Sequence, residues 1–136
     1  MKLWPAVAAV AFVAAACGGG DGRQLEGTFW VLESGRDVPL EPGITATASF
    51  RDDTVRGYTG CNQYTAPYKA EGESLEIGAV ASPRMACPPP RDVIEQAYVA
   101  ALDDVASWST DGDTLVLSDA AGDELLRYTP ARTGDM

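Results

Sequence analysis

Apolar and polar residues alternate over most of the chain after residue 25, and this period of two is typical of β-strands with one buried face. In the segment 45–50, for example, Ala46, Ala48 and Phe50 alternate with polar neighbours. β-Branched and aromatic residues strengthen the same pattern elsewhere. The pattern predicts strands at residues 28–32, 45–50, 54–58, 74–80, 107–109, 114–118 and 124–129.

One segment follows a helical period instead. Apolar side chains recur there at spacings of three and four, which places them in one stripe along a helix: Ile94, Ala97, Tyr98, Ala101, Leu102 and Val105. Three prolines at 88–90 block extension upstream, and Asp92 with Glu95 matches a capping box at the helix start. We expect the stripe to pack on a sheet as part of the core, in preference to lining a ligand groove.

Strands, one helix and further strands, joined by hairpin-length links, predict an α+β fold with a curved antiparallel sheet and one main amphipathic helix packed on it. Arg51-Asp52-Asp53 predicts a tight hairpin turn, and Gly112 and Gly122 mark two more turns. With 136 residues, the chain has room for a single small domain, which we place at 25–130. Residues 131–136 are expected to be a disordered tail.

The first residues have the order of a secretory signal. A basic start at Lys2 precedes an apolar run and three alanines, so residues 1–16 are predicted to be a signal peptide. Ala14-Ala15-Ala16-Cys17 resembles the bacterial lipobox, in which the cysteine receives lipid and the chain is cut before it. Stable anchoring needs two or more acyl chains. A plain cleaved signal and an uncleaved membrane helix remain as alternatives.

Residues 17–24 are rich in glycine and are predicted to be a flexible tether between the lipid and the domain. We therefore expect an exported protein, lipid-anchored through Cys17 to the cell membrane or outer membrane, with its domain on the periplasmic or extracellular side.

The chain has three cysteines, an odd number for an oxidising compartment. If Cys17 carries lipid, Cys61 and Cys87 are left to pair, and closing the loop between them would stabilise the fold by roughly 3 kcal/mol. The alternative is two buried free thiols.

The net charge of −10 arises from 20 acidic and 10 basic residues. An acidic surface repels phosphate backbones and anionic lipid head groups. We therefore expect no nucleic-acid partner, and we expect the membrane to be reached through the lipid alone. The acidic residues are scattered, as on a solvated surface that keeps a monomer soluble.

Several motifs occur in an order that resembles the META domain family, also called HslJ-like, over residues 25–128. They are Leu25-x-Gly27-x-x-Trp30, Gly60-Cys61-Asn62-Gln63-Tyr64 and Arg84-Met85-Ala86-Cys87, followed by the helix with Glu95, Tyr98 and Leu102 and by Leu115, Leu117, Gly122 and Leu125. The resemblance implies a small α+β domain often carried by bacterial lipoproteins. It implies no general catalytic activity, since members of the family are linked to heat shock, antibiotic tolerance and envelope maintenance.

The sequence supplies little catalytic chemistry. The absence of histidine removes the usual neutral-pH base, Ser-His and Cys-His nucleophilic pairs and imidazole zinc sites. The Asp111-Gly112-Asp113 segment lacks the spacing of a calcium loop, and the pairs Asp52-Asp53 and Asp103-Asp104 lack an apolar setting that would tune a general acid. We therefore predict no catalytic residue, no cofactor and no metal.

The segment from Gly60 to Tyr64 is interpreted as a bulge or corner that places Cys61 against Cys87, because glycine and asparagine accept unusual backbone angles. A recognition loop built from Asn62, Tyr64 and Tyr68 is the alternative. Two functions remain open. The first is a non-enzymatic envelope lipoprotein with a binding, structural or stress-related role, which contacts an envelope protein, a wall component or a hydrophobic ligand through one sheet face. The second is an envelope hydrolase or a thiol-disulfide redox factor.

Overall fold

The computed structural model describes residues 25–83 and 85–131. The expected signal peptide at 1–16, Cys17 with the tether at 17–24, and positions 132–136 of the expected tail lie outside these residues.

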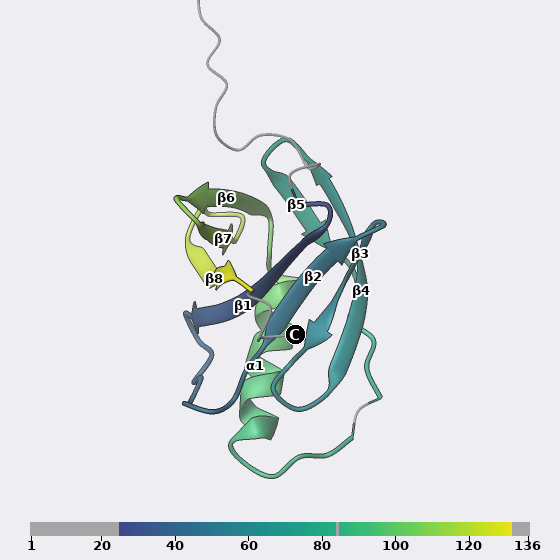
Figure 1. The fold of residues 1–136 in the computed structure, drawn as a ribbon, viewed down its shortest axis with the longest axis vertical. Helices are drawn as coiled ribbons and strands as arrows, with labels where there is room; N and C mark the ends of the chain where they lie inside the picture. The colour runs from purple at the N-terminus through teal and green to yellow at the C-terminus, as the bar shows by residue number, and fades with distance from the viewer. Residues whose placement is uncertain (1–24, 84, 132–136) are drawn as a thin grey trace, which may run out of the picture.

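Eight strands form a closed barrel in which every strand pairs antiparallel with its neighbour in sequence and β8 returns to β1 (Figure 1). The strands are β1 (Thr28–Gly35), β2 (Thr47–Arg51), β3 (Thr54–Tyr58), β4 (Gln63–Glu71), β5 (Ser74–Ile77), β6 (Ser107–Asp111), β7 (Thr114–Ser118) and β8 (Glu124–Pro130). A single helix in the described part of the chain, α1 (Arg91–Asp103), joins β5 to β6.

The predicted α+β fold, a curved antiparallel sheet with one main helix packed on it, is therefore wrong, since the protein is mostly β and its sheet closes into a barrel. One cause is the missed strand β4, where Tyr64, Ala66 and Tyr68 alternate inward but Pro67 occupies one of the outward positions between them. Proline lacks the N–H that a central strand needs. The Pro67 carbonyl accepts a hydrogen bond from Gly78 N (2.8 Å), which lies just past the end of β5. The N–H that proline lacks is therefore not needed for a regular pair between β4 and β5.

The other predicted strands are present. β3 and β7 have the predicted bounds, and the remaining strands differ from the prediction by a few residues at their ends. The tight turn between β2 and β3 is confirmed, with positive φ angles at Asp52 (55°) and Asp53 (63°). Two such residues in succession form the hairpin turn whose twist matches that of paired strands.

The helix occurs where it was predicted, but it starts differently. Pro90 is the N-cap residue and makes no side-chain cap, so the predicted capping box is wrong. Asp92 instead accepts a bond from the N–H of Val93 (2.7 Å), and Glu95 turns toward the loop before β4. Ile94, Tyr98 and Leu102 are buried as expected. The helix is too short and too polar to cross a membrane, and the part of the chain covered by the structure contains no other helix that could.

The helix fills the barrel from one side. Figure 1 shows α1 behind the wall formed by β1–β4, which we call the front wall. An eight-stranded barrel has an interior just wide enough for side chains to fill. The largest fully buried side chains here are Trp108, Tyr98, Tyr128 and Phe50, so the interior is occupied by the protein's own core.

Candidate functional site

The loop between β3 and β4 is held by a buried polar network centred on Asn62, which is 3% exposed. Its amide nitrogen donates to Met85 O (2.9 Å) and to the Glu95 carboxylate (3.0 Å), and its amide oxygen accepts from Met85 N (3.1 Å). The Thr59 hydroxyl donates to the same carboxylate (2.7 Å) and accepts from Asn62 N (2.9 Å). Asn62 therefore fastens the segment before α1 to the barrel.

The predicted pairing of Cys61 with Cys87 is confirmed by a disulfide with a Cα–Cα distance of 6.0 Å. Gly60, at φ 103°, makes the corner that presents Cys61, as its position in the motif suggested. Arg91, at the start of α1, donates to the Gly60 carbonyl (2.7 Å). The disulfide and the Asn62 network thus hold the same segment at two neighbouring points.

This segment extends the front wall beyond β4. Thr65 and Ala81 exchange two backbone hydrogen bonds, Thr65 N to Ala81 O (3.0 Å) and Ala81 N to Thr65 O (2.9 Å). Residues 81–83 therefore lie beside β4 in the place that β5 has left. We call them the rim, and Asn62 and the disulfide hold the chain that follows it.

Three buried tyrosines meet inside the barrel. The hydroxyls of Tyr64 and Tyr98 donate to the Thr47 carbonyl (2.8 and 3.0 Å), and Tyr128 lies 2.8 Å from the Tyr98 hydroxyl. Tyr128 can donate to Tyr98, so every hydroxyl proton has an acceptor. Burial, the largest cause, raises the pKa of all three phenols above the ordinary tyrosine range. These groups are structural, and they stay protonated at neutral pH.

Thr47 makes this arrangement possible by using both of its oxygens. The Thr47 hydroxyl accepts a hydrogen bond from the N–H of Tyr58 (2.9 Å). In the ladder between β2 and β3 the hydroxyl oxygen thus replaces the Thr47 carbonyl as the acceptor. The carbonyl is then free to turn into the core. Gly57 is required beside it, because a Cβ atom there would meet Thr47 O at 2.3 Å.

Tyr68 packs near the turn between β2 and β3. Its ring makes an edge contact with Phe50 (centroids 5.0 Å apart), and its hydroxyl donates to Glu26 (3.4 Å). Burial, and then the Glu26 carboxylate, raises the pKa of the phenol. Asn62, Tyr64 and Tyr68, the three residues of the alternative recognition-loop interpretation, are thus each 9% exposed or less, and all three make contacts within the protein.

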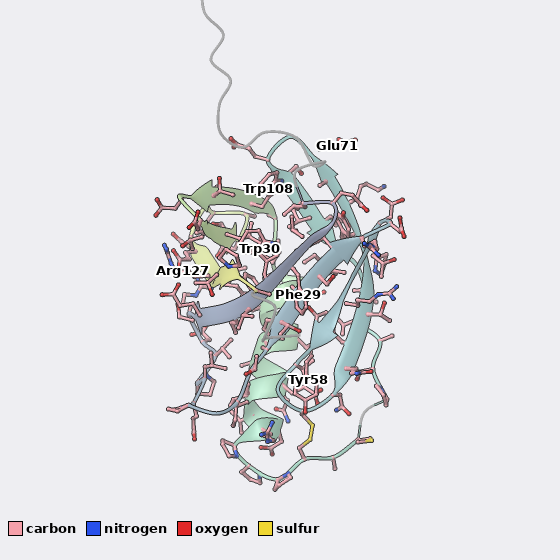
Figure 2. The ribbon with its side chains drawn as sticks, in the orientation of Figure 1. Phe29, Trp30, Tyr58, Glu71, Trp108 and Arg127 are labelled. Atoms are coloured by element: carbon pink, nitrogen blue, oxygen red, sulfur yellow. A yellow bond between two sulfur atoms is a disulfide. The ribbon has the colours of Figure 1, made fainter. Side chains whose placement is uncertain are left out.

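An open groove of about 1100 Å³ lies on the outer face of the front wall. Its side chains come from β1 (Phe29, Val31), β3 (Arg56, Tyr58) and β4 (Thr65), and the rim closes one end. Trp30 and Leu32 pack with the core, so their neighbours Phe29 and Val31 point outward. Figure 2 shows Phe29 and Tyr58 over the front wall, with Arg127 well apart at β8.

The strand register aligns these positions across the wall. Phe29 pairs with Ser49, Ser49 with Arg56, and Arg56 with Thr65, which in turn bridges to Ala81. We call this line the transverse row. Ser49 and Thr65 are small, so the side chains of Phe29 and Arg56 project further from the sheet than their neighbours in the row.

Apart from Tyr64, which also lines the groove, the groove residues were not singled out in the sequence, where only a sheet face in general was expected. A signal was present in β1, since Phe29-Trp30-Val31-Leu32 is apolar at four successive positions. A strand with one face in water normally alternates, so such a run indicates a second apolar face. Arg56 carried no comparable signal.

The described residues hold no other chemical centre. Among residues 25–83 and 85–131, no group of three or more His, Cys, Asp or Glu is placed to hold a metal ion. Every buried side-chain nitrogen and oxygen in those ranges has a hydrogen-bond partner. Asp52-Asp53 forms a turn, and Asp103 and Asp104 end the helix.

Comparison with known proteins gives one family and three similar folds. A family model for the META domain matches residues 23–132. An NMR structure of a protein from Burkholderia xenovorans is similar, with a TM-score of 0.67 and 23% identity, over 92% of this chain and 99% of that one. A second NMR structure has a TM-score of 0.63 and 23% identity, over 83% of this chain and 94% of that one.

A crystal structure of a DUF4847 family protein from Bacteroides vulgatus has a TM-score of 0.59 and 11% identity, over 79% of this chain and 94% of that one. At these identities the likeness shows the fold alone. Comparison with curated protein sequences finds no match.

Proposed function

The chain belongs to the META domain family, and on this premise we propose that it is a non-enzymatic binding lipoprotein of the cell envelope. The folded domain contacts a partner through the groove on its front wall. Lipid on Cys17 keeps the domain at the membrane, and the signal peptide at 1–16 directs its export.

The groove is the observation that carries the proposal. Phe29, Val31 and Tyr58 offer apolar and aromatic surface on the outside of the barrel, and Arg56 stands among them. Aromatic residues and arginine are the residues that contribute most at protein interfaces. Polar residues such as Thr45, Gln63 and Thr65 line the groove beside these apolar side chains, and a mixed surface of this kind is usual for a non-obligate interface. The barrel interior offers no comparable ligand space, because core side chains occupy it.

The geometry gives less support to a hydrolase or a redox factor. Hydrolysis would need a base and a nucleophile in an open site, but the chain has no histidine and its clustered tyrosine hydroxyls are buried. A redox factor would need an accessible sulfur. Cys61 is 6% exposed and Cys87 is half-buried, and the bond between them ties the end of a long loop to the barrel, as structural disulfides do.

Site-specific photo-crosslinking in living cells tests the proposal. A photoreactive phenylalanine replaces Phe29 or Tyr58, where an aromatic ring already stands, and Thr110 of the exposed end of β6 serves as the control position. We expect one or a few discrete envelope products from the two groove positions and none from Thr110. Equal labelling from all three positions, or no product above a lipid-anchored control protein, would rule the groove out as the contact.

Intact mass of the protein purified from native membranes tests the anchor separately. The expected mass is that of residues 17–136 plus acyl groups on Cys17. Reduction should add the mass of two hydrogen atoms, because it breaks the disulfide. A mature chain without acyl groups would end the lipoprotein proposal but would leave the groove proposal standing.

A further inference from the structure

The groove differs in charge from the rest of the molecule. Its lining contains one charged side chain, Arg56, and no acidic one, although the chain has 20 acidic residues and a net charge of −10. A site that gathered this lining by chance from such a surface would include carboxylates. The lining therefore favours an occupant that is neutral or anionic.

Two more cations stand on the same outer surface. Arg51 in β2 follows the buried Phe50, Arg56 in β3 follows the buried Val55, and Lys69 in β4 follows the buried Tyr68, so all three point outward. Within residues 25–83 and 85–131, none of the three makes an ion pair with a described carboxylate.

The cations elsewhere on the described surface are engaged. Arg36 pairs with Asp37 and Asp119, and Arg127 pairs with Glu124 and Asp111. Arg91 donates to the Gly60 carbonyl. Lys69 lies directly opposite the exposed Glu76, and Arg51 precedes Asp52 and Asp53. Arg56 is thus the one of the three front-wall cations that lies among groove residues without a carboxylate, where it complements an anionic group.

The dimensions of the groove fit a short extended chain. The transverse row from Phe29 to Ala81 crosses four strand-to-strand steps, and each step is about 4.8 Å, which gives roughly 19 Å. An extended peptide advances about 3.3 Å per residue, so about six residues span the row. Phe29 marks one end, Arg56 stands near the middle and the rim stands at the other end.

Backbone pairing is not available to the occupant, because each strand of the front wall already has a neighbour on both sides. A peptide cannot add itself as a further strand there, so its side chains decide the affinity. Arg56 attracts acidic side chains, and the rings of Phe29 and Tyr58 contact apolar ones.

We propose that the groove binds an extended segment of a partner protein, about six residues long, with an acidic side chain opposite Arg56 and apolar side chains against Phe29 and Tyr58. This inference rests on the proposed binding function and names the chemical class of its partner. It concerns the preference for charge and apolarity, which the crosslinking experiment does not measure.

Fluorescence anisotropy with defined peptides tests it on the full chain purified in detergent. The probes are three labelled octapeptides that alternate leucine with glutamate, glutamine or lysine. We expect the glutamate peptide to bind about fivefold more tightly than the glutamine peptide, the ratio given by one exposed ion pair of about 1 kcal/mol. The ratio should shrink at high salt, and the lysine peptide should bind least.

Matched variants connect the preference to the groove. Arg56→Gln should abolish the preference for glutamate, and Arg56→Glu should reverse it in favour of lysine. Arg127→Gln removes one positive charge from a half-buried strand position on β8, outside the groove, and should leave the preference unchanged. Phe29→Ser should weaken all three peptides together, because it removes apolar contact and not charge.

Three outcomes would overturn the inference. In the first, Arg56→Glu leaves the peptide order unaltered. In the second, polygalacturonate displaces the labelled glutamate peptide more effectively than the same unlabelled peptide does, when the two competitors are compared at equal carboxylate concentration. This would assign the groove to acidic glycans. In the third, binding occurs only after deletion of residues 132–136, which would make this chain's own end the occupant. Discrete crosslinks from Phe29 and Tyr58 would still support the binding function in the first two cases.

Discussion

Thr47 shows how one residue can serve two structures at once. Its hydroxyl replaces its carbonyl in the strand ladder, and the carbonyl turns inward to accept two tyrosine hydroxyls. A buried carbonyl or hydroxyl without a partner costs about 1–3 kcal/mol. The network avoids this loss by giving every buried polar group a partner, and it fixes β2, β4, β8 and α1 to one point.

The Tyr98 hydroxyl lies at the centre of this network, so its removal should lower the stability of the fold. Tyr98→Phe leaves the Tyr128 hydroxyl buried without its recorded partner, while Thr47 O keeps Tyr64. We expect the free energy of unfolding to fall by about 1–3 kcal/mol, measured by urea denaturation. Tyr58→Phe, on the outer face, is the control and should change it by less than about 0.5 kcal/mol. Equal stability of the two variants would show that the network contributes nothing.

Individual residues could be predicted from the sequence when their role was local or set by type. The Cys61–Cys87 pair and the burial of Tyr98 belong to this group, the first by cysteine count and the second by helical period. Thr47 and Gly57 could not be predicted. Their roles depend on a carbonyl that leaves its ladder, and that event depends on two tyrosines distant in sequence.

At the scale of the elements, the C-terminal end of α1 carries acidic side chains, which interact unfavourably with the helix dipole. Asp103 is its last residue and Asp104 its C-cap, and the last turn contains no basic residue. Backbone carbonyls give that end a partial negative charge, which lowers stability beside carboxylates. Asp103→Lys should therefore raise the free energy of unfolding by about 0.5–1 kcal/mol at low salt.

Glu41→Lys makes the same change of charge in an exposed loop and is the control. It corrects for the general relief of repulsion in an acidic chain. The gain from Asp103→Lys should exceed that of the control and should shrink at high salt. A gain equal to that of the control would show that only net charge matters.

The segment between β5 and α1 has little secondary structure of its own, so its position depends on the disulfide and on Asn62. Cys61→Ser with Cys87→Ser should lower the free energy of unfolding by about 3 kcal/mol, as expected for release of a loop of this length. Crosslinking from Tyr58 should weaken as well, since the rim is then held only by its Thr65–Ala81 hydrogen bonds and by the Asn62 network. Cys17→Ser retains the pair and should keep the stability of the unaltered domain. An unchanged urea midpoint in the double variant would contradict the structural role.

At the scale of the whole molecule, the closed barrel was the feature that the sequence could not reveal. Period two identified strands one by one, and seven of the eight were predicted. Closure depends on the pairing of β1 with β8, and no local pattern records a contact between the two ends of the domain. Pro67 concealed the remaining strand, because a proline argues against a central strand even though Tyr64, Ala66 and Tyr68 alternate regularly.

Alkaline pH should unfold the whole barrel. The pKa values of Tyr64, Tyr98 and Tyr128 are raised in the folded state, so their contribution to stability is complete below the unfolded tyrosine pKa of about 10. It is lost as the pH rises above that value, by about 1.4 kcal/mol per pH unit for each tyrosine. Urea unfolding between neutral and alkaline pH should show this decline.

Tyrosinate absorbance provides the second measurement. Of the five tyrosines, the three inside the barrel should ionise only together with loss of the near-ultraviolet circular dichroism of the folded state. Ionisation of all five near pH 10 while that signal persists would show that the cluster is open to water.

The seam between β1 and β8 also sets an order of assembly. Most other pairings are hairpins that can form early from local contacts, and only the β5–β6 pairing among them spans α1, whereas this seam joins Val31 to Thr129. Until the final strand arrives, the first one presents unpaired amides along one side, which is the kind of edge that recruits other chains. The unfinished barrel is therefore most prone to aggregate just before its last strand docks.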